Sequence, residues 1–205
     1  GENFTAYHTP GSPAQVVMLG MQVIGAKRFP DLLISGINYG ENVGQDISMS
    51  GTIGAAIQAR CMGVPALAVS LQVPVEYHYQ YGEVNWDVAG HFSDKFAQKM
   101  LGITLPKDVD LLKVDIPQDA TRDTEWTVTK VANRGNFMAL LDSPNLNSTL
   151  KECKIVVRDD FETVEKDSDI YTLHIKKLVS VSPISLDVTS RIELPKLQNF
   201  INDSD

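Results

Sequence analysis

The chain has 205 residues, 43% of them hydrophobic, and a formal net charge of -8 at pH 7. This is enough apolar material for a buried core. The acidic balance, without any Lys/Arg cluster, argues against a protein that coats a nucleic-acid polymer or lies on a membrane surface. No apolar run approaches the roughly 20 residues that span a bilayer. Cys61 and Cys153 fit no metal or disulfide spacing, so we expect a reducing, cytoplasmic setting.

The first part of the chain alternates between helical and strand patterns. Ser12 is a predicted N-cap with Pro13 after it, and the apolar stripe that follows predicts a helix that ends before Pro30. Further patterns predict strands at 31–35, 66–71 and 110–117 and helices at 50–63 and 85–102. This alternation predicts a Rossmann-like, layered α/β/α core with a mainly parallel sheet.

The second part alternates apolar with polar residues. This pattern predicts antiparallel strands at 125–132, 153–161 and 168–183, with a short closing helix at 194–201. We therefore predict one domain over 1–205, made of an α/β core (1–117) and an antiparallel β extension with a C-terminal helix (118–205).

The stretch "SGINYGENVGQDISMSGTIGAA" (35–56) is unusually rich in glycine and polar residues for a connection. It follows a predicted strand, and ligands in open α/β sheets bind beyond the carboxyl ends of strands. Ser50, Gly51 and Thr52 open the next helix with hydroxyls and free N–H groups, which suits a phosphate. Asn38 and Asn42 add oxygens that could ligate Mg²⁺ or Mn²⁺. Each residue alone is more typical of a cap or turn, but together they indicate an anion site that could also hold a metal ion.

Five segments resemble the SurE survival-protein family. The longest and most specific is "PDLLISGINYGENVGQDISMSGTIGAAIQARCMGVPALAVSL" (30–71). "TPGSPAQVVMLGM" resembles the family's Gly-Thr-Pro-Ala-Asp segment, with Ser12 and Gln15 as departures. "LLKVDIP" resembles its Leu-Asn-Val-Asn-Val-Pro strand, "VTKVANRG" its Thr-Arg-x-Gly turn, and "SDIYTLHIKKLVSVSPISLDVT" its late strand. The resemblance covers nearly all of the chain.

The resemblance implies a metal-dependent phosphatase that hydrolyses nucleoside 5'- and 3'-monophosphates and uses the extension to form a homodimer or tetramer. By the family's pattern Asn38 would be a metal ligand. The family's other metal ligands, two adjacent aspartates and a serine, belong to a segment that we expect before Gly1. The implied substrate contacts are Ser50, Gly51 and Thr52 for the phosphate and Asn42 for orienting the substrate or a metal-bound water.

Several other residues of the chain are candidates for the site by residue type. Asp159-Asp160 follow an apolar run, but Phe161 stands where the family has a glycine, and we expect a solvated hairpin. The four histidines share no ligand spacing and are expected to be structural or exposed; they are His8, His78, His91 and His174.

Some alternatives stay open at this point. The aromatic stretch 76–86 is either a packed surface loop or a base-stacking wall. Arg134 either reaches a substrate phosphate or closes a turn. A rival function is a phosphate-binding or oligomerisation module without catalysis. A dinucleotide-binding domain is disfavoured because G-x-G-x-x-G after a strand is lacking.

Overall fold

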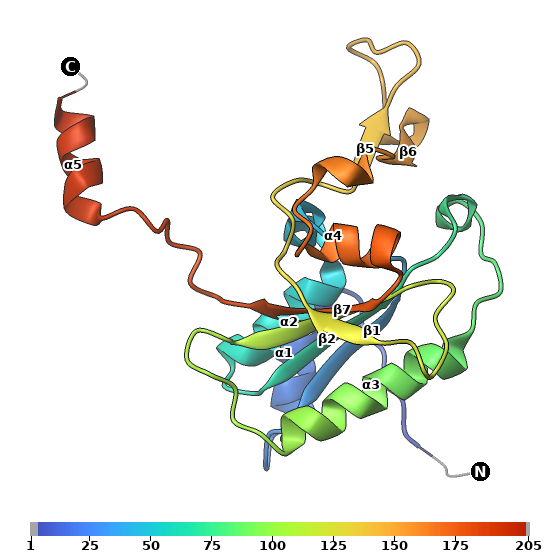
Figure 1. The fold of residues 1–205 in the computed structure, drawn as a ribbon. Helices are drawn as coiled ribbons and strands as arrows, with labels where there is room; N and C mark the ends of the chain where they lie inside the picture. Colours follow the sequence, from blue (N-terminus) through green and yellow to red (C-terminus); the bar gives the residue numbers. More distant parts are fainter. Residues whose placement is uncertain (1–3, 204–205) are drawn as a thin grey trace.

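The computed structural model describes residues 4–203, and its centre is one five-stranded sheet (Figure 1). The strand order is β1-β2-β3-β7-β4. The first three strands are parallel, β7 is antiparallel to β3, and β4 is parallel to β7. The mainly parallel α/β sheet is therefore confirmed. The strands are β1 (Leu33–Tyr39), β2 (Ala66–Leu71), β3 (Leu111–Ile116), β4 (Trp126–Val128) and β7 (Val179–Ile184).

Helices cover both faces of this sheet. On one face lie α1 (Pro13–Val23) and α2 (Gly51–Cys61), and on the other lies α3 (Trp86–Leu101). The predicted start of α1 is confirmed, because Ser12 forms a reciprocal capping box with Gln15. These layers match the predicted α/β/α core.

The central strand β2 shows how the layers are held together. All six of its residues are buried, as expected for a parallel strand covered on both faces. Leu67, Val69 and Leu71 pack with α3, whereas Ala66 and Ala68 pack with α1 and α2. Successive side chains point to opposite faces of a strand, so one short run of sequence fills both hydrophobic cores.

The second half of the chain departs from the predicted strands. A separate antiparallel pair is formed by β5 (Phe137–Leu140) and β6 (Lys154–Val157). The predicted strand 168–183 is wrong over its first half, which folds as α4 (Asp169–Tyr171) and a π-helical turn (Thr172–Lys176) before β7. Ser168 caps this helix by accepting from the N–H of Tyr171. Ile170 and Leu173 are both buried, and their spacing of three residues is helical.

The C-terminal helix α5 (Leu194–Asn202) confirms the prediction of a short helix at the end of the chain. In Figure 1 it stands away from the sheet at the end of an extended segment, and none of its own residues is buried. Among the described residues, no helix is both long and apolar enough to cross a membrane.

Candidate functional site

Strand β1 runs further than predicted and places Asn38 near its end. The sequence predicted a strand at 31–35 followed by a loop, but β1 continues to Tyr39 and pairs Asn38 with Ser70 of β2. The register shifts between Ser35 and Asn38. Gly36 lies at this irregularity, where a Cβ would be only 2.3 Å from the carbonyl oxygen of Val69. Glycine there lets the backbones of β1 and β2 approach closely. Asn38 therefore lies on a strand that is paired with its neighbour.

The amide of Asn38 is oriented by the turn that follows it. Its Nδ2 donates to the carbonyl oxygen of Gly40 at 2.7 Å, which directs Oδ1 to the other side. Gly40 has a φ of 119°, a conformation that favours glycine. The side chain therefore presents a neutral oxygen at the carboxyl edge of the sheet.

The segment after this turn is fixed to the neighbouring strands. The N–H of Asn42 donates to Asp115 Oδ1 at 2.7 Å, and its Nδ2 donates to Ser70 Oγ at the same distance. The N–H of Gly44 donates to Asp169 Oδ2 at 3.0 Å. Asn42 is buried, so its amide nitrogen is engaged within the protein.

A wholly buried charge cluster lies beneath this segment. The ammonium group of Lys113 contacts the carboxylate of Asp115 and lies 3.1 Å from that of Asp169. Burial opposes a charged Lys113, but the two carboxylates hold its pKa above the usual value. Burial raises the pKa of Asp115, against the hydrogen bonds from Lys113 and Asn42. Because these donors converge on the carboxylates, we take the cluster as ionised. Asp115 and Asp169 accept hydrogen bonds from the N–H groups of Asn42 and Gly44 and so fix the two ends of residues 42–44.

The N-terminus of α2 lies at the same edge, because a crossover helix begins where the preceding parallel strand ends. Ser50 is its N-cap, and Oγ accepts from the N–H of Ile53 at 3.1 Å. The first N–H groups of a helix have no intrahelical acceptor, which leaves those of Gly51 and Thr52 for a ligand. A Cβ on Gly51 would lie 2.8 Å from Pro13 Cγ, so glycine also lets the starts of α1 and α2 approach.

A second buried polar group lies nearby, around Glu41. Its Oε1 accepts from Asn136 Nδ2 at 3.1 Å and lies 3.9 Å from His174 Nε2. Burial, helped by Asp115, raises the pKa of Glu41 to about 7. Burial also lowers the pKa of His174 to about 4. These two pKa values keep both groups neutral in slightly acidic solution. Within residues 4–203, Glu41 Oε2 and His174 Nε2 are also buried without a hydrogen-bond partner.

The described residues do not make a divalent-metal site by themselves. Over residues 4–203 no three side chains of His, Cys, Asp or Glu are grouped closely enough to hold a metal ion. Asn38 offers one neutral oxygen, and Mg²⁺ or Mn²⁺ is held in proteins mainly with the help of carboxylates. Asn38 can therefore be one ligand, but not the site.

Two other candidates, Arg134 and Asp160, are engaged with each other, and the carbonyl oxygen of Arg134 accepts from the N–H of Gln45 at 2.8 Å. Asp159 and Asp160 are exposed as expected, although Asp160 lies at the start of a 3₁₀ turn and not in a hairpin. Arg134 pairs with Asp160 at 2.6 Å and also donates to Thr163. These contacts favour the turn-closing interpretation of Arg134.

The aromatic stretch 76–86 packs mainly against Tyr39 of β1. Tyr39 stacks on Tyr81 at 5.2 Å and lies 6.1 Å from Trp86, the first residue of α3. Since Tyr39 and Asn38 are adjacent in a strand, their side chains point to opposite faces of the sheet. The contacts favour the packed-loop interpretation over a wall around Asn38.

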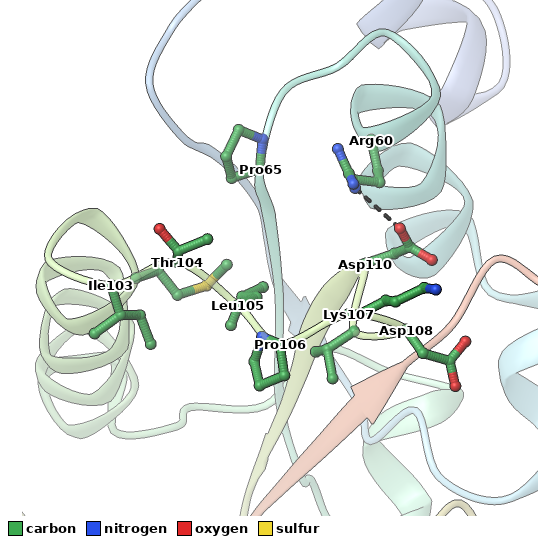
Figure 2. Close-up of a pocket in the computed structure, with 11 residues that line it drawn as sticks. Arg60, Pro65, Ile103, Thr104, Leu105, Pro106, Lys107, Asp108 and Asp110 are labelled. Carbon is green, nitrogen blue, oxygen red and sulfur yellow. Dashed lines mark hydrogen bonds and ion pairs between the residues drawn. The ribbon is translucent and has the colours of Figure 1, made fainter.

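A cavity of about 520 Å³ lies at the opposite, amino edge of the sheet (Figure 2). Its lining includes Pro65, which precedes β2, and Asp110, which precedes β3. Figure 2 shows the ion pair between Arg60 and Asp110 at its rim, with 3.1 Å between nitrogen and oxygen. Ligands of such sheets bind at the carboxyl edge, so this cavity is not the candidate site.

Comparison with known proteins identifies the family of the chain. The family described as "Survival protein SurE" matches residues 1–137. The chain belongs to the SurE family. The 5'-nucleotidase SurE of Thermococcus gammatolerans is 36% identical over 199 residues, which cover 96% of this chain and 72% of the relative. That of Methanocella arvoryzae is 36% identical, covering 97% and 76%. The crystal structure of the SurE protein from Aquifex aeolicus matches with a TM-score of 0.73 and 26% identity, covering 93% of this chain and 73% of that one.

Sequence reasoning on this SurE chain missed the buried charges. Lys113 and Asp115 lie two residues apart in an otherwise apolar run, a spacing that puts both on one face of a strand. Opposite charges two residues apart in an otherwise apolar strand predict an internal ion pair. Asp169 and His174 carry no such signal, because the pattern of their segment predicts a strand and the structure forms a helix there.

Proposed function

We propose that this SurE-family chain hydrolyses phosphoric monoesters, with nucleoside 5'- and 3'-monophosphates as substrates. The observation that carries the proposal is that Asn38 lies near the carboxyl end of β1, at the edge of the sheet where α2 begins. The names of the relatives, 5'-nucleotidase SurE, support the substrate class. A cytoplasmic location is also proposed, because Cys61 and Cys153 are both free thiols, as in a reducing compartment.

The residues of the chain suit a phosphate in a definite way. The N–H groups of Gly51 and Thr52 donate to non-bridging phosphate oxygens, and the positive end of the helix dipole favours their charge. The hydroxyls of Ser50 and Thr52 are further donors, since Ser50 Oγ uses only its acceptor capacity at Ile53. Donors fixed before the reaction stabilise charge that develops on the phosphoryl group.

We propose that a divalent cation, Mg²⁺ or Mn²⁺, takes part in the reaction and that Asn38 is one of its ligands. When bound, such an ion polarises phosphoryl oxygens and lowers the pKa of water. Asn42, held by Asp115 and Ser70, would orient the substrate through its remaining carbonyl oxygen.

The test is release of inorganic phosphate from adenosine monophosphates by the full-length gene product. We expect turnover of both the 5' and 3' isomers with Mg²⁺ or Mn²⁺, and none after exhaustive chelation. Full turnover in the presence of chelator would contradict the metal requirement. Tight nucleotide binding without any turnover would instead favour a non-catalytic phosphate-binding module.

We also propose that the chain forms a homodimer or tetramer through its second half. Val188 and Leu194, on the extended segment and α5, are 94% and 64% exposed. Apolar side chains exposed on an arm indicate a contact surface, and a second copy of the chain fits the family resemblance. Light scattering at micromolar concentration is expected to show an oligomer that dissociates when residues 186–205 are removed. A monomer before removal would contradict the proposal.

A further inference from the structure

His78 lies at the carboxyl edge although no sequence spacing links it to Asn38. It ends a 3₁₀ turn, Val75–His78, between β2 and α3. A Cβ built on Gly40 would lie 3.1 Å from Cε1 and 3.7 Å from Nδ1 of His78, and 3.9 Å from Nδ2 of Asn38. The imidazole and the Asn38 amide therefore approach the same side of Gly40, and the missing side chain keeps the space between them open.

The ring of His78 is held in a definite orientation. It packs edge-to-face against Phe137 of β5, with 5.4 Å between ring centroids and 75° between planes. Within residues 4–203, Nε2 is buried without a hydrogen-bond partner, whereas Nδ1 is not among the buried unpartnered atoms. An orphaned buried N–H is rare and costly, so the ring proton belongs on Nδ1. Burial also lowers the pKa of His78, which keeps the ring neutral at neutral pH.

We propose that His78 is a catalytic residue of this site, whose Nδ1–H donates a hydrogen bond to the ester oxygen that leaves phosphorus. The inference rests on the proposed function, because it needs a phosphomonoester at Asn38. The α2 N-terminus supplies donors for the non-bridging oxygens. His78 is a donor from a different segment, positioned beside Asn38 and available for the bridging oxygen.

The chemistry that this hydrogen bond assists is ordinary ester hydrolysis. The bond between phosphorus and the ester oxygen breaks, and its electron pair stays on that oxygen. The attacking water supplies the new phosphorus–oxygen bond and, through solvent, the proton that the alcohol product carries. His78 keeps its own proton and stabilises the negative charge on the departing oxygen, as a fixed donor does at other developing oxyanions.

The test compares two leaving groups in the full-length protein. A ribose alkoxide needs stabilisation as it leaves, whereas nitrophenolate leaves readily without it. His78→Phe keeps a ring against Phe137 but removes the donor, and His78→Gln restores an amide N–H. His91→Phe, on α3, is the matched control. We measure kcat and KM of each variant with adenosine 5'-monophosphate and with p-nitrophenyl phosphate.

We expect His78→Phe to lower kcat for the nucleotide about 100-fold and that for p-nitrophenyl phosphate by no more than about threefold. His78→Gln should fall between, and the control should match the unaltered protein. An equal loss with both substrates, or no loss, would overturn the assignment while leaving the proposed function intact. Absence of turnover by the unaltered protein with either substrate would instead refute the proposed function and this role together.

Discussion

The two edges of the sheet carry polar residues in opposite environments. At the amino edge, Arg60 and Asp110 pair at the rim of an open cavity with 39% and 25% of their side chains exposed. At the carboxyl edge, Lys113, Asp115 and Asp169 are wholly buried. Buried charges are costly to place and strongly destabilising to disrupt, whereas exposed pairs contribute little. The difference indicates that the carboxyl edge is where this chain maintains a fixed, water-poor arrangement.

The comparison predicts a large difference in stability between two matched substitutions. Lys113→Met should lower the free energy of unfolding by about 3–5 kcal/mol, because it leaves two carboxylates buried without their partner. Arg60→Met should lower it by about 0–1 kcal/mol, because water screens that pair. Urea unfolding of both variants measures the difference.

A further variant separates charge from packing in this cluster. Lys113→Asn combined with Asp115→Asn replaces the ion pair with two neutral amides. We expect the double variant to be less stable than Asp115→Asn alone. Asp115→Asn leaves Lys113 paired with Asp169, whereas the double variant leaves Asp169 buried without a cation. If Lys113→Met and Arg60→Met lowered the free energy of unfolding equally, the proposed difference between the carboxyl and amino edges of the sheet would be wrong.

The neutral pair Glu41 and His174 predicts a smaller, pH-dependent effect. The pKa of Glu41 rises from 4.5 to about 7 on folding, so the folded state binds more protons and stability falls as pH rises across that range. The pKa of His174 falls from 6.5 to about 4, so the unfolded state binds more protons and stability rises with pH between these values. Each contribution is about 3 kcal/mol, and in the intact protein the two oppose one another.

Single substitutions should reveal separately how Glu41 and His174 make the free energy of unfolding depend on pH. With Glu41→Gln the remaining His174 contribution should make stability rise from pH 4 to 6.5, and with His174→Gln stability should fall from pH 4.5 to 7. Urea unfolding at three pH values across this window is the measurement. If both variants kept the pH profile of the unaltered protein, the two groups would not titrate as described.

Much of the core could be predicted from sequence, because local signals agreed with the tertiary structure there. Ser12 and Pro13 mark the start of α1, and the apolar run of β2 is buried on both faces. The segment 168–183 was mispredicted because Ile170 and Leu173 satisfy a helical spacing within a pattern that also alternates. Only tertiary packing decides between the two.

The candidate site was only partly predictable for a related reason. Asn38 and the start of α2 lie within one continuous block of sequence, so their spacing carried the signal. His78 lies 38 positions beyond Gly40, and the loop after β2 brings it back to the edge. Nothing local to His78 encodes that contact, since it depends on the three-dimensional course of the loop and on the space that Gly40 leaves open.

The most direct test of the carboxyl edge as the site compares Asn38→Ala with Arg60→Ala. Phosphate release from adenosine 5'-monophosphate is measured in the full-length gene product with saturating divalent metal. The account predicts a loss in kcat/KM of about 100-fold for Asn38→Ala, as expected for an oriented group at the reacting phosphate, and a change within about twofold for Arg60→Ala, since that pair is remote from the edge where ligands bind. A large loss with Arg60→Ala and near-normal activity with Asn38→Ala would contradict it.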